Sequence, residues 1–219
     1  MAMDELMITN TATDMPLHQI LAMFSGTFPT GAFAFSHGIE QAIKDHLIAD
    51  CDTFKQYLHN LVEQGSSWND LLLLRASYFG QDTKELAVAL ASSQSRRKET
   101  EDQGFAFAHN INKIYGIHVD PAPLPVVVGQ ISKRLNLDID RVSSAYLHSI
   151  ISNWISIGIR LVPIGQTDGQ IILHSLFPVM EQLVQRSKQA DLDQLTSCGL
   201  LSEICAMRHH SAKTRICIT

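Results

Sequence analysis

The chain has 219 residues, of which 45% are hydrophobic and 18% are charged, so it can bury a core without disulfides or metal ions as cross-links. Its net charge of −5 argues against a general nucleic-acid-binding protein, which needs a basic surface. The four cysteines have neither C-x-x-C nor zinc-ligand spacing, and no Lys or Arg precedes Lys44, so a secretory signal is not indicated. We therefore expect a cytoplasmic protein with free thiols and no nucleic-acid partner.

The first segments predict a short helix and a packed loop. Residues 1–15 are polar and aperiodic, and are expected to form a disordered lead-in. A helical pattern then includes Leu17, Ile20, Leu21 and Phe24. In residues 28–40, Pro29 and Gly31 require a turn, and three Phe side chains need apolar cover. Gly38 lies where the next helix should begin.

Regular helix signals follow. Helix starts are predicted at Asp50, Ser67, Asp82 and Ser95, and helix ends at Gly65, Gly80 and Gly116. On the last of these helices, Arg96 with Glu99 and Arg97 with Glu101 have the spacing of helical ion pairs. Their simplest interpretation is a solvated helix face.

The longest apolar run, residues 142–162, predicts a central helix. Pro125 is suited to the first turn of the helix before it, and Asp138 or Asp140 can cap it. One stripe of this helix is small or polar and would let another backbone come close: Ser149, Ser152, Asn153, Ser156 and Arg160. A membrane span is the competing interpretation, but the polar residues in the run and the lack of a second such segment favour a buried core helix.

The remaining pattern completes the fold prediction. After Pro163, Thr167 and Gln170 have the spacing of a capping box. Asp191 is expected to start the last helix, with Leu195, Leu201 and Ile204 on it, before a polar tail at 207–219. No alternating run is long enough for a sheet. We predict an all-α protein, a single bundle of about eight to ten helices over residues 16–206 with flexible N- and C-terminal tails.

Signatures of catalysis are missing from the sequence. Neither nucleotide-binding loop occurs, nor do H-E-x-x-H and G-x-S-x-G, so we expect no enzyme and no cofactor. His209 and His210 are adjacent, but neighbouring helical positions point in different directions, which is unfavourable for one metal ion. Exposed tail histidines are the simpler interpretation. Two segments remain, residues 28–40 and 165–170. Structural corners are one interpretation of both, and the Gln side chains of 165–170 would also suit contact with another backbone.

These segments resemble the UreF family of urease accessory proteins. Residues 28–40 (FPTGAFAFSHGIE) resemble its L-P-x-G-G-F-x-x-S-x-G-L-E signature at Pro29, Gly31, Phe33, Ser36, Gly38 and Glu40. Residues 160–170 (RLVPIGQTDGQ) match R-L-x-P-L-G-Q-x-x-G-Q at Arg160, Pro163, Gly165, Gln166, Gly169 and Gln170. Arg208, His209 and Arg215 match its C-terminal tail. Ala32 replaces the usual second Gly, His210 replaces an acidic residue, and the final residues differ from the usual ending.

The resemblance covers nearly the whole chain from about Leu17 and implies a non-enzymatic chaperone. Such proteins are all-α and dimeric, and bind between a UreD/UreH-type scaffold and the GTPase UreG. The complex docks on urease apoprotein and helps to insert nickel. The matching residues are then expected to bind partners, and residues 207–219 to be held by the scaffold.

Two alternatives stay open at this point. The protein could be a GTPase-activating protein that lends Arg208 or Arg215 to UreG. It could also bind and carry nickel directly through His209 and His210.

Overall fold

The computed structural model describes residues 15–196, 199–210, 212 and 214–218. The elements are α1 (Met15–Met23), the 3-10 helix η2 (Ala32–Ala34), α2 (Ile39–Lys44), α3 (Cys51–Gln64), α4 (Ser67–Tyr78), α5 (Lys84–Ala89), α6 (Gln94–Tyr115), α7 (Leu124–Arg134), α8 (Ile139–Leu161), α9 (Gln166–Ser187), the 3-10 helix η3 (Leu192–Gln194) and α10 (Leu200–His210). No described residue lies in a strand, so the predicted all-α bundle and its approximate helix number are confirmed. Of the predicted lead-in, only Met15 is described.

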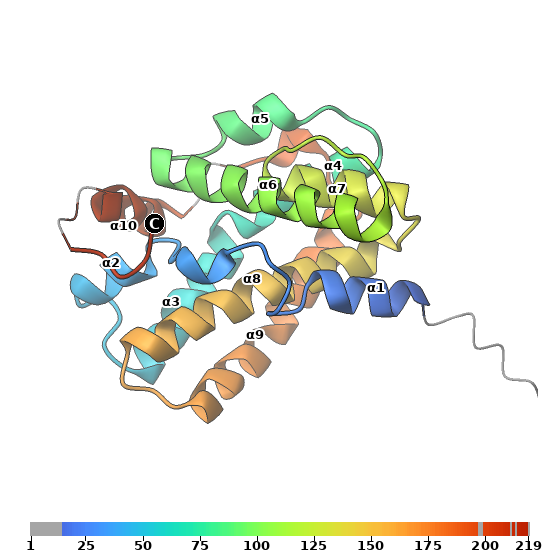
Figure 1. Ribbon diagram of the computed structural model, residues 1–219. Coiled ribbons are helices and arrows are strands. Elements are labelled where there is room, and N and C mark those ends of the chain that lie inside the picture. Colours follow the sequence, from blue (N-terminus) through green and yellow to red (C-terminus); the bar gives the residue numbers. More distant parts are fainter. Residues whose placement is uncertain (1–14, 197–198, 211, 213, 219) are drawn as a thin grey trace, which may run out of the picture.

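Helix α8 runs through the middle of the bundle, with α6 and α7 on one side and α9 on the other (Figure 1). It begins at Asp138, whose carboxylate accepts a hydrogen bond from the Arg141 amide, as predicted. Two clusters of buried hydrophobic residues flank it, and Ile150 packs against both. The apolar circumference of α8 is therefore explained by contacts on two sides, and the core-helix interpretation is confirmed.

Local signals located most helix ends correctly. Asp50 caps α3 through the Thr53 amide, and Gly65 ends that helix. Pro125 lies in the first turn of α7. The start of α6 was placed wrongly, because Ser93, not Ser95, accepts the hydrogen bond of the Arg96 amide and caps the helix.

The predictions for the last two helices were also partly wrong. Helix α9 begins at Gln166, before Thr167, and the carboxylate of Asp168 accepts the Gly165 amide. The Thr167–Gln170 capping box is therefore not formed. Asp191 starts only the short η3, and the last helix begins separately at Leu200.

None of the helices in the described ranges combines the length and the sustained hydropathy that a bilayer span requires.

Candidate functional site

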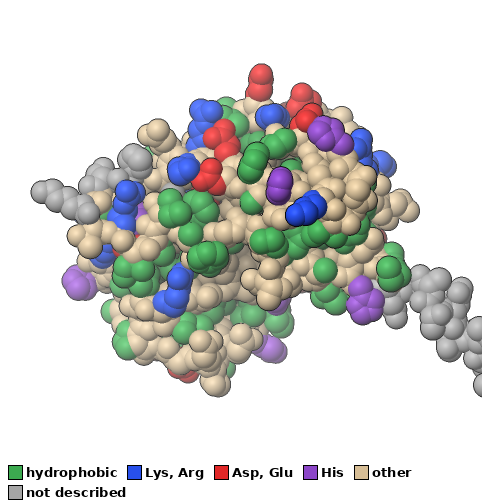
Figure 2. Space-filling model, viewed as in Figure 1, with side chains coloured by type: hydrophobic (Ala, Val, Ile, Leu, Met, Phe, Trp, Pro, Cys, Tyr) green, Lys and Arg blue, Asp and Glu red, His purple; other side chains and the backbone are tan. Residues whose placement is uncertain are grey.

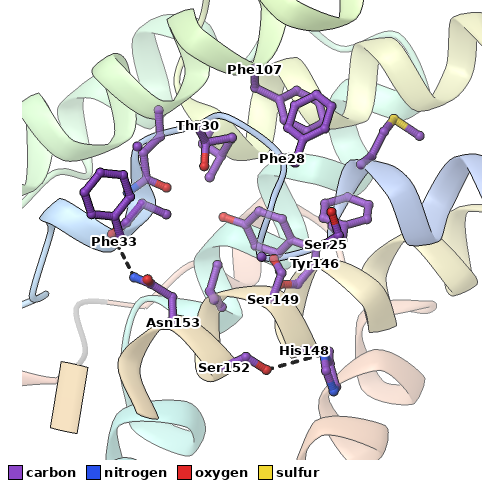
Figure 3. Close-up of a pocket in the computed structure, with 18 of the residues that line it drawn as sticks. Ser25, Phe28, Thr30, Phe33, Phe107, Tyr146, His148, Ser149, Ser152 and Asn153 are labelled. Carbon is purple, nitrogen blue, oxygen red and sulfur yellow. Dashed lines mark hydrogen bonds between the residues drawn. The ribbon is translucent and has the colours of Figure 1, made fainter. Parts of the chain in front are cut away.

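The first motif lies on the small-residue stripe of α8. The Asn153 side-chain amide donates to the Ala32 carbonyl at 2.9 Å (Figure 3), and the Arg160 guanidinium donates to the Phe33 carbonyl at 2.9 Å. The predicted approach of another backbone is thus confirmed, and that backbone belongs to η2. Two segments about 120 residues apart are joined by side chains that reach backbone oxygen atoms.

A cavity of about 820 Å³ lies between the loop after α1, α6 and α8. Phe28 packs on Phe107 at a ring-centroid distance of 5.2 Å on one wall, and serines of α8 line the opposite wall (Figure 3). Phe35 is buried, but Phe33 is 69% exposed. The expectation that all three Phe side chains of the loop are covered is therefore wrong for Phe33.

Glycines give the first motif its shape. Gly31 has φ +73° and takes the left-handed conformation, so Ala32 can begin η2 without a positive φ. Gly38, at φ +80°, caps α2, and a Cβ there would lie 2.9 Å from the Ser202 carbonyl oxygen of α10. The turn at Gly38 therefore brings α2 directly onto α10.

Glu40, on α2, is the point where several segments meet. Its side chain is only 2% exposed. Its carboxylate accepts hydrogen bonds from the amides of Ile216 and Cys217, at 2.8 to 3.1 Å, and from the Lys44 ammonium at 2.7 Å. Burial alone would raise the pKa of Glu40, but these bonds and the His209 ring lower it to about 2. Glu40 is therefore a charged acceptor inside the protein.

The tail lies against α2 and η2 through further contacts. Lys44 donates to the Thr214 carbonyl, and the Ile218 amide donates to the Ala34 carbonyl at 2.7 Å. Arg208 pairs with Asp45 at 2.7 Å. In Figure 1, α2, α10 and the C-terminus gather at one end of the molecule, where α8 also passes into α9.

His209 corrects one sequence interpretation. Its side chain is fully buried, and its Nε2 lies 3.0 Å from a Glu40 carboxylate oxygen. The simple expectation of exposed tail histidines is wrong for His209, because α10 extends through this position and packs on α2. The His210 side chain lies outside the described part.

The second motif forms the corner between α8 and α9. Pro163, Gly165, Gln166 and Gln170 are exposed. Gly169 is buried, since a Cβ there would lie 2.6 Å from the Ile159 side chain. Among the described residues, neither glutamine side chain forms a hydrogen bond with the tail, so this corner presents a separate polar surface at the same end.

A buried polar cluster was missed by the sequence interpretation. Arg96 and Glu99 form an ion pair whose side chains are 11% and 7% exposed, so the predicted solvated face is wrong for this pair. The neighbouring pair Arg97–Glu101 is indeed half-exposed. The missed signal is helical spacing: Arg96, Glu99 and Gln103 continue the face on which Phe107 and Ile111 are buried.

His37 and Asp70 extend this cluster. Burial and then the charge of Arg96 lower the pKa of His37, and its neutral ring can donate to Glu99 and accept from Ser66. Burial raises the pKa of Asp70 to about 6, although Arg96 and the Tyr146 hydroxyl oppose the shift. The first motif is thus connected to α4, α6 and α8 through ionisable groups beside the cavity.

No group of three or more His, Cys, Asp or Glu residues with suitable placement occurs among the described residues. Cys51, Cys205 and Cys217 are free thiols, as expected.

Comparison with known sequences agrees with this arrangement. The UreF family profile matches residues 48–177. The chain is 37% identical over 203 residues to the urease accessory protein UreF of Cereibacter sphaeroides, which covers 91% of this chain and 97% of that protein. The chain belongs to the UreF family of urease accessory proteins. The resemblance inferred from its motifs is confirmed.

Other UreF proteins show similar coverage. The chain is 36% identical over 194 residues to UreF of Roseobacter denitrificans, covering 86% of this chain and 87% of that protein. It is 34% identical over 218 residues to UreF of Rhodopseudomonas palustris, covering 91% and 92%. The similarity to UreF therefore extends well beyond the profile match, over most of the chain.

Exposure separates the UreF motif residues into two groups. The exposed ones, which a partner can contact, are Pro29, Phe33, Arg160, Pro163, Gly165, Gln166, Gln170, Arg208 and Arg215. Gly31 is half-buried. The buried ones are Ser36, Gly38, Glu40, Gly169 and His209. The second group holds backbone segments together, so it can affect a partner only through the segments that it positions.

Proposed function

We propose that this UreF-family protein is a nickel-insertion chaperone for urease, without enzymatic activity of its own. It bridges a UreD/UreH-type accessory protein and the GTPase UreG, and with them acts on urease apoprotein in the cytoplasm, as a homodimer. The observation that supports this best is the meeting of distant motif segments at one end of the bundle. Protein recognition explains such a convergence, because a contiguous surface is built from loops and termini on a rigid helical scaffold.

The corner between α8 and α9 supplies the most direct test. Gln166 and Gln170 are exposed at the start of α9, and their side chains form no hydrogen bond among the described residues. Replacing both by Ala should weaken capture of a co-expressed UreD/UreH-type or UreG-type protein at least tenfold and leave melting unchanged. Gln182→Ala is the matched control, because Gln182 is also exposed on α9 but lies 12 residues beyond Gln170.

Three results would contradict the proposal. Equal capture by the double variant and by Gln182→Ala would remove the corner from partner binding. Loss of helical content in the double variant would instead make the corner structural. Failure of the unmodified chain to copurify with either accessory protein would overturn the bridging function.

The alternative role towards UreG has its own readout. Arg208 and Arg215 are both exposed at the end where the motifs meet. If one of them acts in GTP hydrolysis, the purified chain should stimulate GTP turnover by UreG, and a single Arg→Ala change should abolish it. Unchanged GTP turnover would contradict the GTPase-activating role and leave bridging as the remaining function.

A further inference from the structure

One carboxylate connects α2 with the C-terminal tail. Glu40 lies in α2 and accepts hydrogen bonds from the amides of Ile216 and Cys217. These residues are 176 and 177 positions further along the chain. Backbone amides bound to a charged oxygen form stronger hydrogen bonds than amides bound to a neutral one. Without these amides, the buried carboxylate would retain only Lys44 and His209 as partners. The same contact therefore satisfies Glu40 and fixes the path of the tail.

This contact brings exposed hydrophobic side chains of η2 and of the C-terminal tail to the same part of the surface. The Ile218 amide binds the Ala34 carbonyl, which places the tail beside η2 and its Phe33. Phe33, Ile216 and Ile218 are 69%, 71% and 48% exposed. We call these three residues the composite surface. Large apolar side chains that gather on a surface rather than in the core are typical of protein-binding sites.

Basic side chains border the composite surface. Arg160 donates to the Phe33 carbonyl and is close enough to lower the pKa of Cys217, which burial raises overall. Arg215 bonds only to a carbonyl of its own segment among the described contacts, and neither arginine has an ion pair there. Lys44 is paired with Glu40, which is buried and presents no charge to solvent. Figure 2 shows Lys and Arg side chains among hydrophobic ones on the half of this face nearest the C-terminus, with Asp and Glu side chains farther up the same half.

We propose that Glu40 is a positioning residue that latches residues 214–218 onto α2 and η2, and so builds the composite surface for a partner protein with an apolar patch and an acidic rim. The charge of the partner follows from Arg160 and Arg215, which form no ion pair among the described residues. This inference rests on the proposed function, since it identifies how the partner surface is assembled. It makes Glu40 important for binding although the partner cannot touch it.

Hydrogen exchange tests the latch without any partner. In the full-length chain, Glu40→Gln removes the negative charge and replaces one acceptor oxygen by an NH2 group, which cannot accept a hydrogen bond from the tail amides. The amides of Ile216 and Cys217 should then exchange at least tenfold faster, while those of α8 keep their protection. Glu40→Asp keeps the charge on a shorter side chain, so its exchange rates at these amides should lie between those of the unmodified chain and of Glu40→Gln. Unchanged exchange in Glu40→Gln would overturn the latch.

A second variant guards against misfolding of Glu40→Gln. Ile216→Pro removes one donor from the tail and leaves α2 untouched. It should also accelerate exchange at Cys217 at least tenfold. Normal protection of Cys217 in this variant would contradict the latch even if Glu40→Gln could not be purified.

Partner capture tests the composite surface, with a purified UreD/UreH-type protein as the probe. Ile216→Asp keeps the backbone donor but places an acid on the surface, and Arg215→Glu reverses a border charge. Each should weaken capture at least tenfold. Glu40→Gln should weaken it too, but should add no further loss in the Ile216→Asp background, because both act through one surface.

The outcomes separate this inference from the proposed function. Additive losses would show that Glu40 acts elsewhere and would overturn the latch as a route to binding. Normal capture by Ile216→Asp and Arg215→Glu, with loss in the Gln166/Gln170 double variant, would overturn the composite surface and leave the bridging function standing. Absence of capture by the unmodified chain would overturn both the bridging function and the surface, whereas the exchange result would still decide the latch.

Discussion

Single residues in the first motif act through backbone geometry. Gly38 has a positive φ and meets the backbone of α10, whereas Gly31 has a positive φ but no neighbouring atom within 4 Å of a built Cβ. The two positions therefore separate conformational strain from steric overlap. They also show why similar glycines in one motif can have different roles.

Gly38→Ala should destabilise the protein by about 3 kcal/mol, because left-handed strain and overlap with α10 add. Gly31→Ala should cost only about 1 kcal/mol, since strain alone remains. Urea unfolding of both variants measures the difference. Equal losses would show that α10 moves away from α2 without cost.

The raised pKa of Asp70 should make the protein less stable as pH rises, the opposite of the usual effect of a carboxylate. Its pKa in the folded chain is about 6, above its usual value near 3.9. Between about pH 4 and 6 the folded state therefore binds more protons than the unfolded state, and this residue's contribution to stability falls as pH rises.

Asp70→Asn should leave stability unchanged at pH 4 and raise it at pH 7 by about 1 kcal/mol, a value reduced for the nearby cavity that water can enter. Unfolding at the two pH values tests this. Asp102→Asn, on the exposed part of α6, is the control and should show no such difference. A stability loss at pH 7 in Asp70→Asn would mean that the charge is needed.

Helices show how far periodicity can be used. The apolar spacing of α3 and the proline at the start of α7 predicted those elements correctly, because both signals act within one or two turns. On α6, the charge pairs at its start have nearly the same spacing in sequence but different surroundings. Whether a pair is buried depends on how α6 packs against distant helices. Periodicity in α6 indicates this only when its apolar face is extended towards the N-terminus of the helix.

Glu99→Gln should therefore destabilise the protein by about 3 kcal/mol, because it leaves the Arg96 guanidinium buried beside a neutral partner. Glu101→Gln, which breaks the exposed pair on the same helix, should change stability by less than about 0.5 kcal/mol. Thermal or urea unfolding of the two variants provides the comparison. Similar effects would mean that Arg96 finds another partner.

The whole molecule combines opposite pH effects. Glu40 and Glu99 both have pKa values of about 2, below the usual value near 4.3. Between these values the unfolded chain binds more protons, so the stability contributed by both residues is present above about pH 4.5 and is lost as pH falls towards 2.

Acid unfolding should therefore steepen below about pH 4.5, with each carboxylate contributing on the order of 2 kcal/mol. A series of urea unfolding curves from pH 2 to 7 measures this slope. Glu99→Gln should reduce it by about half. An unchanged slope in that variant would assign the acid sensitivity to other groups.

The candidate site was only partly predictable. Sequence motifs selected the segments that meet at one end of the bundle, including Arg160 and Glu40, but not which of their side chains face solvent. Glu40 and His209 match UreF motifs and are buried against each other. Phe33, expected under cover, is exposed. At these three positions the exposure of the side chain is set by neighbours far away in the sequence, and the motifs themselves do not encode it.

The sequence by itself determined the helical class, the positions of most caps and breaks, and membership of the UreF family, because helix periods, cap residues and family motifs are local features. Tertiary structure decided which polar groups are inside and how α2 and η2 meet the C-terminal tail. The reason is physical: a carboxylate such as Glu40 can remain charged in the interior only where donors converge on it, and here two of those donors come from the opposite end of the chain.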